Sequence, residues 1–321
     1  MFKKSLKFCA ATLGLLVSVG VGAQDYPSKP LRMIVPFPPG GVMEIVARAV
    51  AVKLAIALGQ AVVAENRAGA SGVIGAEAGA RSPDDGSTFV MGNISTLEIN
   101  PVTFAKLPYD PIASFDPVSM VAIQPLIIAV QPSRPVQSLS ELVQYAKSQP
   151  GKLNYDTAGS SIHLAVEFFS TAAGIKMNHI PYKGSASALT DLIGGQVQVL
   201  FDPFLSIYPF VSSGKVRALA LTTDKRSATA TTLPTVAVSG YANFDVSSWQ
   251  GIVVRARTPK SVIQRLNQDL VKVLSTSEMK ERFAQYSAVT AASTPEQFSS
   301  YIKEEMARWQ QVAIDAGVKP Q

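Results

Sequence analysis

The sequence predicts an α/β protein with two domains built on parallel β-sheets, followed by a helical tail. Short runs of β-branched residues alternate with longer stretches of helical periodicity, an order typical of parallel strands joined by helices. The chain has 321 residues, and about 298 remain if residues 1–23 are removed as described below, which is enough for two domains. From Pro259 onward the periodicity is helical, which predicts a tail that packs on an earlier part of the fold.

The predicted strands and helices alternate through most of the chain. Three strands are each followed by a helix: Leu31–Pro36 by Met43–Leu58, Lys152–Tyr155 by Ile162–Ala173, and His179–Tyr182 by Ala186–Ile193. Further runs have the composition of strands: Ala61–Glu65, Thr88–Met91, Leu126–Val130, Val197–Phe201, Ala218–Thr222 and Gly251–Val254. The predicted tail helices begin near a Pro, Ser or Thr, which helix starts prefer: Lys260–Ser275, Ser277–Gln285 and Pro295–Ala316.

The N-terminus has the pattern of a secretory signal peptide. Three lysines precede an apolar run from Phe8 to Val21, and the small residues Gly22 and Ala23 suit a cleavage site. A permanent membrane anchor is the alternative, but the run is shorter than the roughly 20 apolar residues that span a bilayer. We therefore predict that residues 1–23 direct export and are removed.

Cysteine content and charge exclude several classes of function. Cys9 is the only cysteine and lies in the predicted signal, so the mature chain has no thiol for disulfides, catalysis or metal binding. Removing three lysines leaves 26 basic against 23 acidic residues, a formal charge of +3. The basic residues are scattered and form no dense run with aromatic residues, which argues against a nucleic acid partner.

Two glycine-containing loops are candidates for ligand binding. Ligands of open α/β sheets bind beyond the carboxyl ends of strands, where loops lead into helix N-termini with free N–H groups. Pro36–Gly41 leaves one predicted strand and enters a helix, and Ala158–Ser161 does the same later in the chain. Each loop could instead be an ordinary turn, and Ser160 or Ser161 could simply cap its helix.

Motifs for cofactors, metals and catalysis are missing. The glycines between Gly69 and Gly75 lack the G-x-G-x-x-G spacing of dinucleotide-binding loops. His163 and His179 are the only histidines, and neither has a metal-ligand spacing. Ser212–Lys215 fits S-x-x-K without the accompanying S-D-N and K-T-G motifs, and we interpret it as a helix end followed by a strand. We predict no catalytic residue, no metal and no cofactor.

A series of ordered motifs extends over the mature chain: Pro36–Gly41, Ala47-Arg48, Glu65–Arg67 with its glycine-rich sequel to Gly75, Ala76-Glu77, Pro83–Gly86, Leu107–Pro111, Pro150–Tyr155, His179–Gly184, Leu192–Val197 and Leu233–Val236. In these motifs the chain resembles the Bug family, the substrate-binding proteins of tripartite tricarboxylate transporters. The resemblance implies a two-lobe periplasmic-binding-protein fold, type II-like, with two crossings between lobes and a helical C-terminal tail. We place lobe 1 at residues 24–124 and 248–321, and lobe 2 at residues 125–247.

The resemblance also implies a function. A protein of this family captures a small carboxylate or related organic solute between its lobes in the periplasm and transfers it to an inner-membrane permease. The alternative is a partner that presents its ligand state to a periplasmic sensor domain without transport. Either role is expected of a monomer that needs no cofactor and binds no nucleic acid.

The candidate ligand-binding residues follow from the positions that match the family. They are expected to hold a carboxylate through loop amides, hydroxyls and water: Gly40, Gly41, Glu44, Ser95, Thr96, Ala158, Gly159, Ser160, Ser161, His163 and Asp202. Several have a structural alternative, since Thr96 could cap a helix and Asp202 could bond neighbouring backbone.

The first loop departs from the family pattern. Met43 and Glu44 stand where a small or hydroxyl residue and an Asp usually follow the glycine pair. The longer Glu44 could displace a bridging water or crowd a second carboxylate, so a bulky or aromatic monoacid or a neutral amide is an alternative ligand. Equally, Glu44 could only favour the positive end of its helix.

Overall fold

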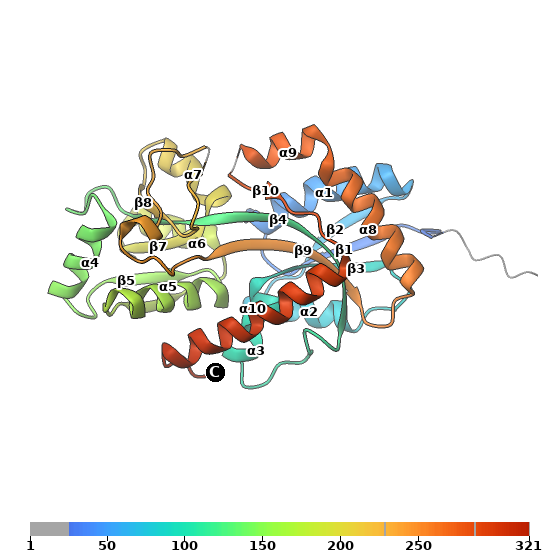
Figure 1. The fold of residues 1–321 in the computed structure, drawn as a ribbon, viewed down its shortest axis with the longest axis horizontal. Coiled ribbons are helices and arrows are strands. Elements are labelled where there is room, and N and C mark those ends of the chain that lie inside the picture. Colours follow the sequence, from blue (N-terminus) through green and yellow to red (C-terminus); the bar gives the residue numbers. More distant parts are fainter. Residues whose placement is uncertain (1–25, 228, 286, 321) are drawn as a thin grey trace, which may run out of the picture.

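The computed structural model describes residues 26–320, apart from residues 228 and 286, and confirms an α/β fold. The predicted signal at residues 1–23 lies outside the described residues. Within them, ten strands form one mixed sheet in the order β2-β1-β3-β9-β4-β7-β5-β6, with β8 and β10 also paired to β4 (Figure 1). The sheet is therefore partly antiparallel, whereas the alternation of strands and helices predicted parallel sheets.

The sheet has two halves that meet along β4 (Phe115–Val130). The residues of β4 from Phe115 to Pro125 pair with β9, whereas Leu126–Val130 pair with β7 and β8. We call the strands on the first side the first half-sheet: β1 (Leu31–Val35), β2 (Val62–Asn66), β3 (Thr88–Asn93), β9 (Ser247–Arg255) and β10 (Val289–Thr290). The second half-sheet contains β5 (Asn154–Thr157), β6 (Asn178–Pro181), β7 (Val199–Pro203) and β8 (Arg217–Leu221).

The predicted strands are found, with one large difference in length. Only Leu126–Val130 of β4 has the expected composition, because Pro117 and Pro125 interrupt the earlier part and its register with β9 shifts twice. The change of partners at Pro125 lies beside the predicted lobe boundary at residue 125. The boundaries themselves stay a prediction.

Helices cover both faces of the two half-sheets (Figure 1). The predicted helices are present with ends shifted by at most two residues: α1 (Val42–Leu58), α5 (Ser160–Ala173), α6 (Ser185–Gly194), α8 (Lys260–Ser275), α9 (Ser277–Ala284) and α10 (Pro295–Asp315). Short helices that the sequence did not predict are α2 (Val73–Ala80), α3 (Asn100–Thr103), α4 (Leu139–Ser148), the 3₁₀ turns η1 (Ala70–Gly72) and η3 (Ala237–Ser239), and the π-helix η2 (Ser95–Ile99). Helix α7 (Phe204–Ser212) ends where the sequence predicted a helix end before a strand.

The helical tail packs on both halves of the molecule. Helix α8 packs on α1 and β4, while α10 contacts β4 and η2 and reaches α5 of the second half (Figure 1). Phe298 and Trp309 anchor α10 in the core, and the Phe298 ring meets Trp249 edge-on with centroids 5.3 Å apart. The tail thus joins the two half-sheets instead of covering the first alone.

Candidate functional site

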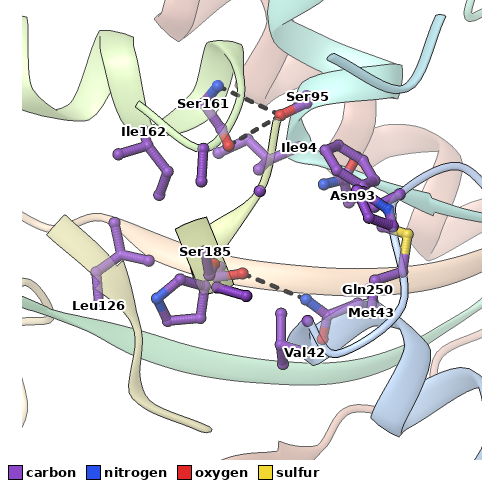
Figure 2. A pocket seen from close by; sticks show the side chains of 18 of the residues that line it. Val42, Met43, Asn93, Ile94, Ser95, Leu126, Ser161, Ile162, Ser185 and Gln250 are labelled. Carbon is purple, nitrogen blue, oxygen red and sulfur yellow. Dashed lines mark hydrogen bonds between the residues drawn. The ribbon is translucent and has the colours of Figure 1, made fainter. Parts of the chain in front are cut away.

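A cavity of about 340 Å³ lies between the two half-sheets. Its walls come from the segments that follow the carboxyl ends of β1, β3, β5 and β6, and from β4, β7 and β9 where the sheet crosses between its halves. Side chains of both halves surround it in Figure 2. The position matches the general rule that α/β proteins bind ligands beyond the carboxyl ends of their strands.

Three helices begin at this cavity, and each starts after a glycine. Gly41, Gly159 and Gly184 are the N-caps of α1, α5 and α6, and none of these helices has a side-chain cap. The first N–H groups of a helix lack intrahelical partners, and the helix dipole adds partial positive charge there. Three uncapped N-termini around one cavity favour an anion inside it.

The first loop and the start of α1 form an apolar wall of the cavity, whereas β3, the turn after it and β9 in the same half add polar side chains. Phe37, Pro38, Val42 and Met43 line the apolar wall, and the Asn66 side-chain amide donates to the Phe37 carbonyl at 2.9 Å and fixes the loop. Met43 therefore presents a thioether where the family pattern has a small or hydroxyl residue. This wall suits the hydrocarbon part of a solute.

Glu44 holds its own loop together and does not line the cavity. Its carboxylate accepts from the Gly40 N–H and from the Arg48 guanidinium, both at 2.7 Å. The Gly40 N–H and then Arg48 lower the pKa of Glu44 below its ordinary value. Glu44 is thus ionised at neutral pH, and the Gly40 N–H is occupied.

The starts of α5 and α6 contribute hydroxyls and a cation to the cavity. Ser161 begins α5, and Ser185 and Ser187 lie in the first turn of α6 beside Lys183. Lys183 forms no hydrogen bond or ion pair with any residue that the structure describes. A cation and three hydroxyls next to two helix N-termini complement a carboxylate.

Two serines join the half-sheets across the cavity. The Ser95 hydroxyl donates to Ser161 Oγ at 2.9 Å and accepts from the Ser161 N–H at 3.3 Å (Figure 2). Behind them, Ser160 Oγ donates to Asn100 Oδ1 at 2.7 Å. These bonds hold the start of α5 against η2 and α3.

The side chain of Thr96 forms hydrogen bonds within its own turn. Its hydroxyl accepts from the Asn93 N–H at 3.0 Å, and its N–H donates to Asn93 Oδ1 at 3.1 Å. This reciprocal pair shapes the π-helix that carries Ser95, and such π-turns are frequent at functional sites.

Two buried carboxyl groups lie at the ends of β5 and β7. Asp156 and Asp202 are both 0% exposed, and the Ser185 hydroxyl donates to Asp202 Oδ1 at 2.5 Å. Burial raises the pKa of Asp202 to about 7, although hydroxyls of Ser185 and Ser206 limit the rise. Burial and then the charge of Asp202 raise the pKa of Asp156 well above its ordinary value.

A second cavity of about 140 Å³ lies on the other side of the α5 start and contains both histidines. Their rings stack with centroids 4.2 Å apart, and His179 Nε2 is hydrogen-bonded to Thr157 Oγ1. Burial lowers the pKa of His163, and burial and then the neighbouring His163 lower the pKa of His179 to about 4. Both imidazoles are neutral at pH 7.

The structure distributes the candidate residues over several places. Four of them line the main cavity: Gly41, Ser95, Ala158 and Ser161. Three border the second cavity: Gly159, Ser160 and His163. The others stabilise the first loop, bond from η2 to Asn93 or lie beneath Ser185: Gly40, Glu44, Thr96 and Asp202. Direct contact of any of these residues with a ligand stays a prediction.

The sequence analysis missed the third helix start. Lys183, Gly184, Ser185 and Ser187 line the cavity, and none of them was predicted. The signal was present, because the strand over His179–Tyr182 is followed by a glycine and then a helix, the same form as the two loops that were selected.

Metal binding and membrane spanning find no support in the described part of the chain. Residues 26–320, as far as they are described, contain no cluster of three His, Cys, Asp or Glu side chains suited to a metal ion. No helix among them has the length and apolar character required to cross a bilayer.

Known proteins resemble the chain over most of its length. It matches the TctC family, the tripartite tricarboxylate transporter family receptor, over residues 46–318. It is 36% identical over 312 residues to Protein BugT of Bordetella pertussis, covering 96% of this chain and 95% of that protein.

Solved structures share the fold. R. palustris Rpa4515 with adipate has a TM-score of 0.90 and 33% identity, with 92% of this chain and 100% of that chain covered. MatC from Rhodopseudomonas palustris with bound malate has a TM-score of 0.85 and 28% identity, with 89% and 99% covered. The predicted fold class and family are therefore confirmed: the chain belongs to the TctC family of solute-binding receptors, which includes the Bug proteins.

Proposed function

We propose that this protein captures a small organic carboxylate in the periplasm and delivers it to a permease of the tripartite tricarboxylate type. One observation carries the proposal: three helices with uncapped glycine N-caps begin at one cavity between the half-sheets. Relatives with adipate and malate support a carboxylate ligand. The predicted signal at residues 1–23 supports export.

The two walls of the cavity suggest the form of the ligand. The carboxylate meets the starts of α5 and α6, where Ser161 and Lys183 offer donors. The hydrocarbon part lies against Phe37 and Met43 on the opposite wall. A cavity of about 340 Å³ suits an acid with a short aliphatic chain or a single ring.

Capture follows from closure of the two halves and requires no chemistry on the solute. An open form admits the acid, and closure brings Ser95 of the first half to Ser161 of the second. The closed form is what the permease recognises. The protein returns its ligand unchanged.

A thermal-shift panel tests the proposal. Adipate, malate, citrate, benzoate and nicotinamide are added separately to the mature protein, and at least one acid should raise the melting temperature, because a ligand of the folded state stabilises it. Calorimetry then gives the affinity, and mass spectrometry of the released acid should find it intact. The proposal is wrong if no acid shifts the protein or if only nicotinamide does.

Uptake in a deletion strain tests delivery. Removal of the gene should abolish accumulation of the identified acid, and the wild-type gene should restore it. Uptake that persists would instead favour a sensor domain as the partner of the closed form.

A further inference from the structure

Two buried carboxyl groups lie near the ends of β7 and β5, and one of them contacts the start of α6. Asp202 belongs to β7, and Asp156 belongs to β5, which is its parallel neighbour in the sheet. Both are 0% exposed, and neither forms an ion pair with the described residues. Only one hydroxyl that lines the cavity, that of Ser185, donates to the pair.

The surroundings of the pair do not neutralise two negative charges. Asp202 faces Ile127 of β4 across the sheet, and its polar neighbours on α6 and α7 are the hydroxyls of Ser185 and Ser206. The titratable groups beside Asp156 are Asp202 and the phenols of Tyr155 and Tyr182, whose pKa values the charge of Asp156 helps to raise. Two neighbouring buried carboxylates cannot both be ionised without a large cost, which favours protonation of Asp202 when a negatively charged ligand approaches.

The proton decides what Ser185 can offer to the cavity. A serine hydroxyl has one hydrogen to donate. When Asp202 is ionised, that hydrogen is committed to Oδ1 over the 2.5 Å contact, and only lone pairs of Ser185 remain for the cavity. When Asp202 is protonated, its own O–H donates to Ser185 Oγ, and the serine hydrogen is free for a ligand carboxylate.

We propose that Asp202 gains a proton when a carboxylate binds at the start of α6, which frees the Ser185 hydroxyl to donate to the ligand, so that the protein takes up a proton as it captures its solute. Asp202 is then a positioning residue that acts through Ser185. The inference rests on the proposed function, because it assumes a carboxylate at the start of α6.

Ser187 provides a matched comparison in the same turn. It also lines the cavity, but its hydroxyl donates to the Gly184 carbonyl at 2.9 Å and has no carboxyl group beneath it. Substitution of Ser187 should therefore leave proton uptake in place, whatever it does to affinity.

Calorimetry with adipate tests the linkage. Titrations at about pH 7.5 in phosphate and in Tris give the number of protons exchanged, and wild-type protein should take up about half to one proton per adipate, with affinity falling up to about tenfold per pH unit above neutrality. Asp202→Asn keeps the shape of the side chain and should abolish uptake. Ser185→Ala should reduce uptake to less than half, and Ser187→Ala should retain it. Binding of adipate without proton uptake by the wild type would overturn the proposal.

A measurement without ligand separates the two possible failures. In ¹³C NMR spectra of carboxyl-labelled protein, one carboxyl signal should titrate near neutral pH and be missing in Asp202→Asn, or move in Asp156→Asn if the first variant does not fold. If no acid of the panel binds, the proposed function fails, while this titration still decides whether the pair exists. Full ionisation of both groups below about pH 6 would refute the proposal, because Asp202 would then not gain a proton near neutral pH.

Discussion

The main cavity and the smaller cavity beside it share the first turn of α5, yet they offer different groups to a solute. Ala158, Ser161 and Ile162 face the main cavity, where three uncapped helices begin. Gly159, Ser160 and His163 border the smaller one, where the stacked imidazoles lie. One turn of helix thus contributes to two environments.

The difference suggests a division of roles. The main cavity has free donors, including Lys183, whereas donors in the smaller cavity are already used, as in the Ser160–Asn100 bond that joins the two halves. We expect the first to bind the solute and the second to hold the closed form. Substitutions around the two cavities should then have different kinds of effect, and four of them test this division.

Ser161→Asp should have the largest effect. A carboxylate in the first turn of α5 repels a bound carboxylate by about 4 kcal/mol at 4 Å and an effective dielectric constant of about 20. Adipate affinity measured by calorimetry should fall more than about 100-fold, while the fold persists because helix starts tolerate Asp. Ser261→Asp makes the same change in the first turn of α8, away from the cavity, and should bind normally. Normal binding by Ser161→Asp would show that the ligand carboxylate does not lie at the start of α5.

Lys183→Met should weaken adipate binding about tenfold, because a hydrogen bond to a charged group contributes about 1.5–3 kcal/mol and this one is partly open to solvent. The loss should shrink as salt is raised to about 0.5 M, since salt screens exposed charges. Lys176, which is exposed and does not line the cavity, gives the control Lys176→Met. A loss that does not depend on salt would argue against a direct charge contact.

Ser160→Ala should weaken binding about fivefold, through closure and without contact to the solute. The hydroxyl bridges to Asn100 and is worth about 1 kcal/mol in the closed form. Because an open molecule must close to bind, the loss should be the same for adipate and malate and should not depend on salt. A loss confined to one acid would place Ser160 in the binding cavity instead.

The sequence predicted local features well and side-chain directions poorly. Helix α8 has the predicted ends, Lys260 and Ser275, because its periodicity and its preceding proline are local signals. Ser160 and Ser161 were both predicted as ligand contacts, yet adjacent residues of a helix point about 100° apart, so only the packed structure shows which cavity each one faces.

The pairing of strands that are far apart in the chain also could not be predicted from the sequence. The role of Asp202 depends on β7 lying beside β5 and on α6 starting above both, so that Ser185 meets the carboxyl group. No local pattern near Asp202 contains that information. In contrast, the glycine before α6 was visible, and the cavity residues from Lys183 to Ser187 could have been predicted from it.

His179→Gln should have the smallest effect on binding, and its main effect should be on stability at acidic pH. Burial holds the pKa of His179 at about 4, below the value near 6.5 of an unfolded chain, so between these pH values the unfolded state binds a proton that the folded state excludes. Stability should therefore fall as the pH drops from about 6.5 to 4, and the melting temperature of the variant should fall less steeply over this range. At about pH 7.5 both proteins should bind adipate within about twofold, because the imidazole is neutral and borders only the smaller cavity. Parallel melting curves across the acid range, or a marked loss of adipate affinity, would show that the two cavities do not act separately.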